Sequence, residues 1–255
     1  FVPFVRGIGS LVLLDVRSDS NAGSVTGVTH VTTILPFVLG VWWLTEVVKI
    51  VEWVDLVDTG GYKRTEAFSR VADDIKAGVK ATVWPPGTDR FVIYPESGKR
   101  RGEGNGVVPI KWGFMAELES RGWKPEVTAW RRKGTGSVPG AFDAHLDFED
   151  GSLPFVVEWE TGNISSSHRA INRIGLGILD QRIAGGVVVL PSAKLAPFLT
   201  DRIGNFPELV PYIPLWREWR NLRPVGYLGL VVVEQDGESW LVPRIPKGRD
   251  GRALL

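Results

Sequence analysis

Hydrophobic and polar positions from residue 66 onwards repeat with two periods, one typical of helices and one typical of strands. Helical spacing predicts helices at 66–80, 109–121, 165–183 and 193–201. Apolar or alternating runs predict strands at 90–94, 124–132, 141–148, 153–159, 185–190, 227–233 and 239–243. The second helix begins at Pro109 and stops before Gly122, which are favoured residues for a helix start and a helix end. The last two strands are expected to pair as a hairpin.

The segment between residues 141 and 190 predicts the fold class. Strands 141–148 and 153–159 flank the turn Glu149–Ser152 and are expected to form a hairpin. Strand 153–159, the helix after it and the fully apolar strand 185–190 form a strand–helix–strand crossover, so these two strands run parallel. We therefore expect an α/β fold, in which a mixed central β-sheet is flanked by helices.

Residues 1–60 do not share this regular pattern. Their apolar stretch at 31–51 is interrupted by Pro36, Glu46 and Lys49, which disfavours a membrane-spanning helix. The pattern of a signal peptide is also missing. We therefore expect residues 1–60 to be an atypical apolar extension that is non-native or poorly ordered. Residues 66–255 are expected to form a single domain with its core at 109–192, without membrane association.

The composition of the 255 residues excludes several kinds of protein. Cys is absent, which excludes disulfides, cysteine nucleophiles and thiolate metal sites. With three His in the chain, any metal would be held mainly by carboxylates, which suit hard ions such as Mg²⁺. The net charge of +1, taken over the whole chain, does not indicate a nucleic-acid-binding protein.

The distribution of charge along the chain changes this picture. Residues 134–163 contain six acidic residues and no Lys or Arg. Residues 97–133 hold nine basic and four acidic residues, a net of +5, and residues 164–255 hold twelve and eight, a net of +4. An acidic segment between two basic ones is the pattern expected of a carboxylate metal site within a phosphate-binding surface.

Two or three acidic residues of this segment are expected to share one patch. Glu158 and Glu160 lie two apart on a predicted strand, so their side chains point to the same face. Asp143 and Asp147 share a face of the preceding strand, and closure of the hairpin can bring Asp147 beside Glu158. Carboxylates gathered in this way repel one another unless a cation or a shared proton intervenes, and the pattern therefore favours a divalent metal ion.

An Asp followed by Glu-x-Glu at a hairpin resembles the core of the PD-(D/E)xK nucleases, in the variant with Glu at the third position. The segments LDFEDGSLPFVVEWETGN at 146–163 and ISSSHRAINRI at 164–174, with the apolar strand that follows, resemble type II restriction endonucleases of the BamHI/BglII kind. The resemblance covers about residues 70–220 and is most specific at 143–173. It implies a restriction-endonuclease-like core and a cytoplasmic, Mg²⁺-dependent enzyme that cuts double-stranded DNA as a homodimer.

The resemblance also implies roles for the acidic residues. Asp147 and Glu158 would bind Mg²⁺, for which Mn²⁺ can substitute. Glu160 stands where most of the superfamily has Lys, and it would orient or deprotonate the attacking water. Glu117 is the best match to a further Glu that the family places near the metal. The linker from Asp147 to Glu158 is long for this family, so Asp143 is the alternative ligand.

Residues near the start of the predicted helix 165–183 are candidates for contact with DNA. Free N–H groups and hydroxyls at a helix start can take a phosphate, and two Arg four residues apart share a helical face. A glycine-rich basic loop at 95–106 can follow the DNA backbone. A solvated basic surface is the alternative for both groups. The candidates are Asn163, Ser165, Ser166, Arg169, Arg173, Lys99, Arg100 and Arg101.

Three functions fit these observations to different degrees. The leading hypothesis is a Mg²⁺-dependent DNA endonuclease of the type II restriction class. A glycoside hydrolase with paired carboxylates agrees with the 11 Trp residues but not with the basic flanks. A non-catalytic DNA-binding homologue of a nuclease would not require an intact acidic cluster. The sequence indicates neither a recognition site nor the geometry of the cut.

Overall fold

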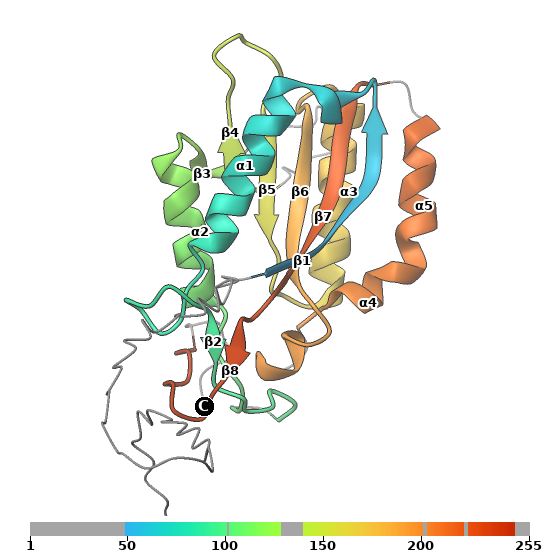
Figure 1. Cartoon of the computed structure of the whole chain (residues 1–255). Helices are drawn as coiled ribbons and strands as arrows, with labels where there is room; N and C mark the ends of the chain where they lie inside the picture. The colour runs from blue at the N-terminus through green and yellow to red at the C-terminus, as the bar shows by residue number, and fades with distance from the viewer. Residues whose placement is uncertain (1–48, 101, 129–139, 201–202, 222–223, 248–255) are drawn as a thin grey trace, which may run out of the picture. The chain divides into compact units, whose positions relative to one another are not determined.

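A six-stranded mixed β-sheet lies at the centre of the fold, with helices on both of its faces (Figure 1). The structure is a computed structural model, and it describes residues 49–100, 102–128, 140–200, 203–221 and 224–247. The strands lie in the order β1 (Lys49–Thr59), β7 (Gly226–Glu234), β6 (Gly185–Pro191), β5 (Phe155–Trp159), β4 (Phe142–Leu146) and β3 (Lys124–Val127). Strands β7, β6 and β5 run parallel to one another, β1 pairs antiparallel with β7, and β4 pairs antiparallel with both β5 and β3.

The predicted crossover and hairpin are both present. β5, α3 (Ile164–Leu179) and β6 form the strand–helix–strand unit, and every residue of β6 is buried. β4 and β5 form the antiparallel pair that precedes it. The predicted α/β class, with a mixed central sheet flanked by helices, is therefore confirmed.

Two long helices cover one face of the sheet. α1 (Glu66–Lys80) begins at its N-cap Thr65, whose hydroxyl accepts the Phe68 N–H, and α2 (Val108–Ser120) has Pro109 in its first turn. Their apolar sides pack on the inner strands through side chains that are fully or nearly fully buried, among them Phe68, Val71, Ile75, Ile110, Phe114 and Leu118. This packing fixes the position of α2 against β4 and β5.

The opposite face of the sheet is covered by α3, α4 (Phe206–Leu209) and α5 (Ile213–Arg217) (Figure 1). Ile171, Ile174 and Trp216 pack there against apolar residues of β6 and β7. Single 3₁₀ turns occur at Tyr62–Arg64, Ala196–Phe198, Val210–Tyr212 and Glu218–Asn221. Within the described ranges, no helix is long and apolar enough to cross a membrane.

The N-terminal limit of the domain differs from the expected one. β1 belongs to the central sheet and pairs antiparallel with β7 from Lys49↔Glu234 to Thr59↔Gly226. The expected extension 1–60 therefore ends too late, and the compact unit that holds the sheet covers residues 44–255. Local patterns do not reveal this partner, because β1 and β7 are about 170 residues apart in sequence. The rest of the expected extension lies outside the described residues.

The C-terminal third shows two further differences. The helix expected at 193–201 is the single 3₁₀ turn Ala196–Phe198. The expected last hairpin does not form, because β8 (Gly237–Glu238) pairs in parallel with β2 (Val92–Ile93). α4 and α5 were not indicated by the sequence. Pro207, Pro211 and Pro214 break the helical pattern there, and each lies in the first turn of a short helical segment.

Candidate active site

A pocket of about 500 Å³ lies where β5 ends and α3 begins. Its wall is formed by β4, by the end of β5 and by the facing sides of α2 and α3. Three acidic and three basic residues are among those that line it: Asp143, Glu158, Glu160, Lys111, Arg169 and Arg173. The formal charges of these six side chains cancel, although the segment 134–163 that supplies the acids is strongly acidic.

The register of the hairpin selects Asp143 for this pocket. β4 pairs with β5 through Ala144↔Val157 and Leu146↔Phe155, and the same register places Asp143 opposite Glu158. The resemblance to the nuclease core favours Asp147 instead, although a turn at 149–152 already implies the register that is observed. The observed connection between the strands covers residues 147–154, which shortens both strands and leaves the register unchanged.

Asp143 is held between α2 and β5. Its Oδ1 accepts a hydrogen bond from Nζ of Lys111 at 2.5 Å, and its Oδ2 accepts the Trp159 N–H at 2.8 Å. The side chain of Asp143 is only 16% exposed. Lys111 was not among the residues predicted from sequence, because its contact with Asp143 depends on how α2 packs against the sheet.

Glu158 forms a buried ion pair with Arg173 of α3. The guanidinium of Arg173 also lies over the ring of Phe142, 4.5 Å from its centre. Burial lowers the pKa of Arg173, and the charges of Asp143 and Glu126 oppose this shift. Arg173 is thus turned toward the acidic residues of the pocket, rather than toward solvent as the predicted DNA contact requires.

Glu126 of β3 is a further acidic residue near this pocket that the sequence patterns did not single out. Its charge is close enough to oppose, in part, the lowering of the Arg173 pKa by burial. Its backbone has a φ of 53°, which is uncommon for a residue with a side chain.

Glu160 follows β5 directly and has a different environment. Its Oε1 accepts the Gly162 N–H at 2.8 Å, and its own N–H donates to the Val189 carbonyl at 2.7 Å. Burial raises the pKa of the Glu160 carboxyl, and the charge of Asp143 adds to the shift against the opposing Gly162 N–H. Glu160 therefore binds a proton more readily than an ordinary glutamate.

Asp147 lies outside the pocket. Its side chain is 53% exposed and contacts Nζ of Lys124 and Nε2 of His145, each at 2.8 Å. Lys124, and then His145, lower the pKa of the Asp147 carboxyl. The structure therefore does not bring Asp147 beside Glu158.

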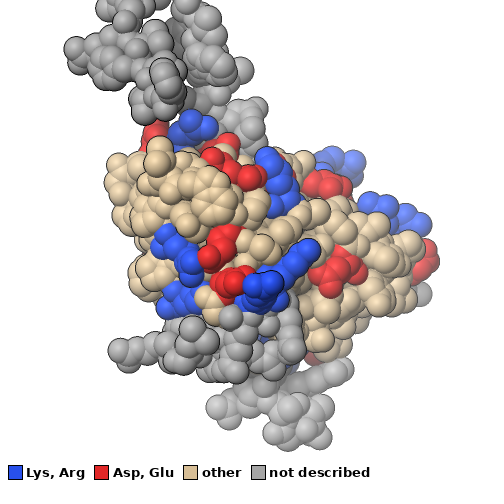
Figure 2. Space-filling view, turned by 90° about the horizontal axis from the view of Figure 1, so that it is seen from below, with Lys and Arg blue, Asp and Glu red and all other residues tan. Residues whose placement is uncertain are grey.

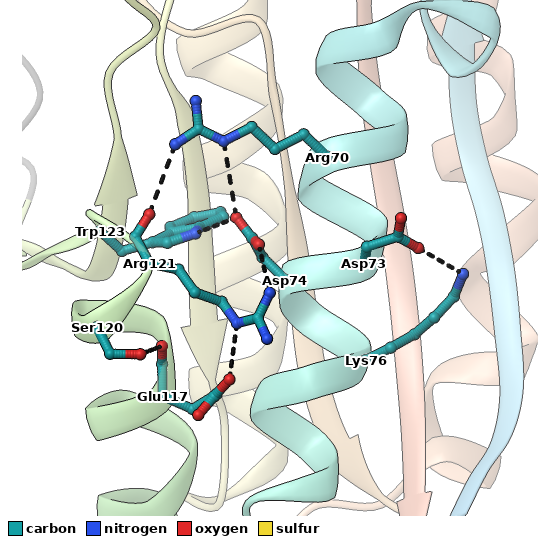
Figure 3. A network of polar contacts seen from close by, with 8 residues as sticks. All are labelled: Arg70, Asp73, Asp74, Lys76, Glu117, Ser120, Arg121 and Trp123. Carbon is teal, nitrogen blue, oxygen red and sulfur yellow. Dashed lines mark hydrogen bonds and ion pairs between the residues drawn. The ribbon is translucent and has the colours of Figure 1, made fainter.

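Glu117 also lies elsewhere, in a polar network that joins α1, α2 and the residues before β3 (Figure 3). It accepts a hydrogen bond from Nε of Arg121 at 2.7 Å. The carboxylate of Asp74 accepts from Arg121 at 3.2 Å and from the indole N–H of Trp123 at 3.0 Å. Glu117 does not line the pocket, and its contacts indicate a structural role.

The start of α3 forms one side of the pocket. Asn163 is the N-cap, and its Oδ1 accepts the Ser166 N–H at 3.1 Å. Ser166 and Arg169 line the pocket, and Nη2 of Arg169 donates to Oγ of Ser166 at 3.3 Å. Ser165 is exposed on the same turn. These residues place hydroxyl, amide and guanidinium donors beside the carboxylates.

The basic loop between β2 and α2 lies apart from these residues. Lys99 is exposed and lines a different cavity of about 470 Å³, and Arg100 is 85% exposed. Arg101 lies outside the described residues. Figure 2 views the molecule from below, and it shows Lys and Arg interleaved with Asp and Glu rather than gathered in one basic patch.

The donor set suits a hard divalent cation, since three carboxylates converge on one pocket and the chain has no Cys. Two of these carboxylates are engaged by basic side chains, Asp143 by Lys111 and Glu158 by Arg173. Across the described residues, no group of three or more acidic or His side chains is arranged closely enough to hold a metal ion as the side chains stand.

A mixed sheet with an Asp on one strand and Glu-x-Glu at the end of the next is the arrangement implied by the sequence resemblance to restriction-endonuclease-like nucleases. A family model described as "Restriction endonuclease BamHI" matches residues 48–252. The chain therefore belongs to the BamHI family of restriction endonucleases, and as a member it is a type II restriction endonuclease, a deoxyribonuclease. The match begins one residue before β1.

Two curated relatives agree with this assignment. The type II restriction enzyme OkrAI of Oceanobacter kriegii is 44% identical over 184 residues, which cover 72% of this chain and 89% of that protein. The type II restriction enzyme BamHI of Bacillus amyloliquefaciens is 34% identical over 191 residues, covering 74% and 84%. Among solved structures, restriction endonuclease BglII complexed with a DNA 16-mer matches with a TM-score of 0.38 and 14% identity, over 49% of this chain and 55% of that one.

Proposed function

We propose that this endonuclease hydrolyses phosphodiester bonds of double-stranded DNA in the pocket of Asp143, Glu158 and Glu160, with Mg²⁺ as its cation. The observation that carries the proposal is the convergence of these three carboxylates, from two adjacent strands, beside the donors at the start of α3. Its place of action is the cytoplasm, where an enzyme of this class meets DNA.

Asp143 and Glu158 are the residues that would hold the cation. Restriction endonucleases use divalent metal ions generally, and oxygen donors favour Mg²⁺, with Mn²⁺ as a substitute. Such an ion, when bound, polarises the phosphate and lowers the pKa of a water molecule. The Trp159 N–H orients the carboxylate of Asp143, which suits this residue to hold a cation at a fixed position.

Glu160 would accept the proton of the attacking water. Its raised pKa keeps it a better proton acceptor than an ordinary carboxylate, and the Gly162 N–H holds one of its oxygens in place. Ser166, Arg169 and the first N–H groups of α3 would bind the phosphate that is cut.

The exposed apolar residues of α3 and of the segment around α4 and α5 support a homodimer. Leu176, Val210, Tyr212 and Leu215 are between 41% and 63% exposed. Large apolar side chains on neighbouring helices are typical of a surface covered by another chain. A second copy of this chain is the partner we propose, since a two-fold dimer matches a palindromic DNA site.

Digestion of mixed plasmid DNA tests the proposed site. With Mg²⁺ we expect discrete fragments, and with EDTA none. Asp143→Asn should lower the cleavage rate by at least about a hundredfold, because several kcal/mol of charge stabilisation depend on a metal ligand. Asp147→Asn, four residues away and outside the pocket, is the matched control and should keep nearly full activity.

The reverse result, in which Asp147→Asn is inactive and Asp143→Asn cuts normally, would show that the ligand lies at the other end of β4. Binding of DNA by Asp143→Asn, measured by fluorescence anisotropy, separates loss of chemistry from loss of folding.

A further inference from the structure

We propose that Lys111 and Arg173 are internal counter-ions, which occupy the carboxylate oxygens that a divalent cation needs until a DNA phosphate draws them away. Metal and DNA would then bind cooperatively. The inference rests on the proposed function of the pocket, and it gives these two residues a positioning role toward the cation.

Lys111 reaches into the pocket from α2 rather than into solvent. Its Nζ lies 2.5 Å from Oδ1 of Asp143, and the side chains are 29% and 16% exposed. Partial burial strengthens such a pair relative to one on the surface. The ion pair uses the oxygen of Asp143 that the Trp159 N–H leaves free.

Arg173 reaches the pocket from the opposite side, on α3. Its guanidinium is paired with Glu158 and stacked over Phe142. A Cβ atom at residue 140 would lie 2.8 Å from Nη1 of Arg173, so Gly140 leaves room for the guanidinium at this place. Both carboxylates assigned to the metal are thus engaged from separate helices.

The charges of the pocket explain why the side chains of Lys111 and Arg173 must move before a metal ion binds. Three acidic and three basic side chains line it, so the pocket is formally neutral before any ligand enters. A divalent cation added beside Lys111 and Arg173 would meet two like charges within the same cavity. Asp143 and Glu158 become available to it only after the two basic side chains move.

A DNA phosphate offers these side chains another partner. Arg169 lies one helical turn before Arg173 on α3, and it lines the same pocket together with Ser166. A phosphate bound there is an anion within reach of the long, flexible side chains of Lys and Arg. DNA thereby raises the affinity for metal, and metal raises the affinity for DNA by the same factor.

The test is the binding of Mn²⁺ to the full chain in the absence of DNA, measured by electron paramagnetic resonance of the free ion. Lys111→Gln should bind Mn²⁺ about tenfold more tightly than the wild type, because one competing charge is removed from a partly buried site. Lys111→Arg should restore the wild-type affinity. Lys124→Gln removes a Lys paired with Asp147 outside the pocket, and it should change nothing.

The sign of the effect separates competition from structural damage. Damage to the pocket weakens Mn²⁺ binding, whereas removal of a competitor strengthens it. Arg173→Gln provides a second variant with the same expected direction, and circular dichroism confirms its fold. Unchanged or weaker binding in folded Lys111→Gln and Arg173→Gln overturns the inference.

Cooperativity is tested with a plasmid fragment that the wild type cuts, in a Glu160→Gln background that keeps it intact. The fragment should increase the affinity of the Glu160→Gln variant for Mn²⁺. This increase should be much smaller in the double variant that also carries Lys111→Gln. If the wild type cuts DNA but the wild type and the variants all bind Mn²⁺ with equal affinity, the counter-ion role is refuted and the proposed function is not. A wild type that neither binds Mn²⁺ nor cuts DNA refutes the proposed function.

Discussion

Glu160 illustrates how a single residue can serve chemistry at a cost in stability. Its carboxyl is removed from much of the solvent, with one Gly162 N–H as a hydrogen-bond donor, and burial raises its pKa above the ordinary value of 4.5. In the unfolded chain the proton leaves at that ordinary value. The folded state therefore binds the proton more tightly, and stability falls as the pH rises from 4.5 through the folded-state pKa.

We expect Glu160→Gln to be more stable than the wild type at neutral pH and almost inactive. The amide has no charge to desolvate, but it cannot accept a proton, so cleavage should fall by roughly 10²–10⁴-fold. Thermal unfolding between pH 4 and pH 8 measures the first effect. The gain should reach a few °C, since about 1 kcal/mol shifts Tm by roughly 2–4 °C in a domain of this size.

The pH dependence provides the control for this prediction. The advantage of Glu160→Gln should shrink as the pH falls through the folded-state pKa and should be lost at about the ordinary value of 4.5. Asp147→Asn should show the opposite sign, because Lys124 and His145 lower the pKa of Asp147 and thereby contribute stability at neutral pH. A Glu160→Gln variant less stable than the wild type at pH 7 would contradict the assigned environment.

At the scale of single residues, local sequence patterns predicted only some of the residues that line the pocket. Glu158 and Glu160 stand out because two acidic residues follow the apolar run of β5 at strand spacing. Asp143 was only the alternative to Asp147, because both lie on the same face of the predicted strand and the resemblance favoured Asp147. Lys111 was not predicted at all, because no local pattern tells which residue of α2 faces β4.

Lys111 lies on α2, and the polar network around Asp74 connects α2 to α1 and to the residues before β3 (Figure 3). Asp74 of α1 is buried, and it joins Arg121 at the end of α2 to Trp123 before β3. Its loss would leave the buried indole N–H of Trp123 without an acceptor.

We expect Asp74→Ala to lower the free energy of unfolding by about 2 kcal/mol, mainly through that buried N–H. The exposed ion pairs with Arg70 and Arg121 add little. Asp73→Ala is the matched control one residue away. Its partner Lys76 is exposed, and the change should stay within about 0.5 kcal/mol. Urea denaturation measures both, and equal losses would show that the network is not what holds α2.

Elements with a regular period were predictable, and those with long-range partners were not. α1, α2, α3 and β6 show their apolar spacing within a single segment. β8 is two residues long and takes its partner β2 from about 145 residues away. No turn or alternation in the sequence marks such a pairing.

At the scale of the whole molecule, the proposed homodimer would decide how DNA is cut. A monomer has one such pocket, and a two-fold dimer would bring one pocket to each strand of the DNA. Leu215 of α5 is 63% exposed on the surface proposed for the second copy.

Leu215→Glu should convert the dimer to monomers at micromolar concentration, because a charge would enter an apolar interface. Light scattering after size-exclusion chromatography measures the mass. Leu241→Glu is the control, since Leu241 is 96% exposed beyond β8 and away from α5. If Leu215→Glu remains a dimer, the interface lies elsewhere on the molecule. If the wild type is a monomer, the proposed dimer is wrong.

The pairing of β1 with β7 also determines when this nuclease can complete its fold during synthesis. β1 leaves the ribosome first, yet its partner begins at Gly226, after every other strand of the central sheet has been made. At about 5–20 residues per second, β1 waits on the order of ten seconds for β7. Throughout that interval the open edge of β1 must be kept from pairing with other chains, so early chaperone contact should concentrate on the strand that was hardest to recognise from sequence.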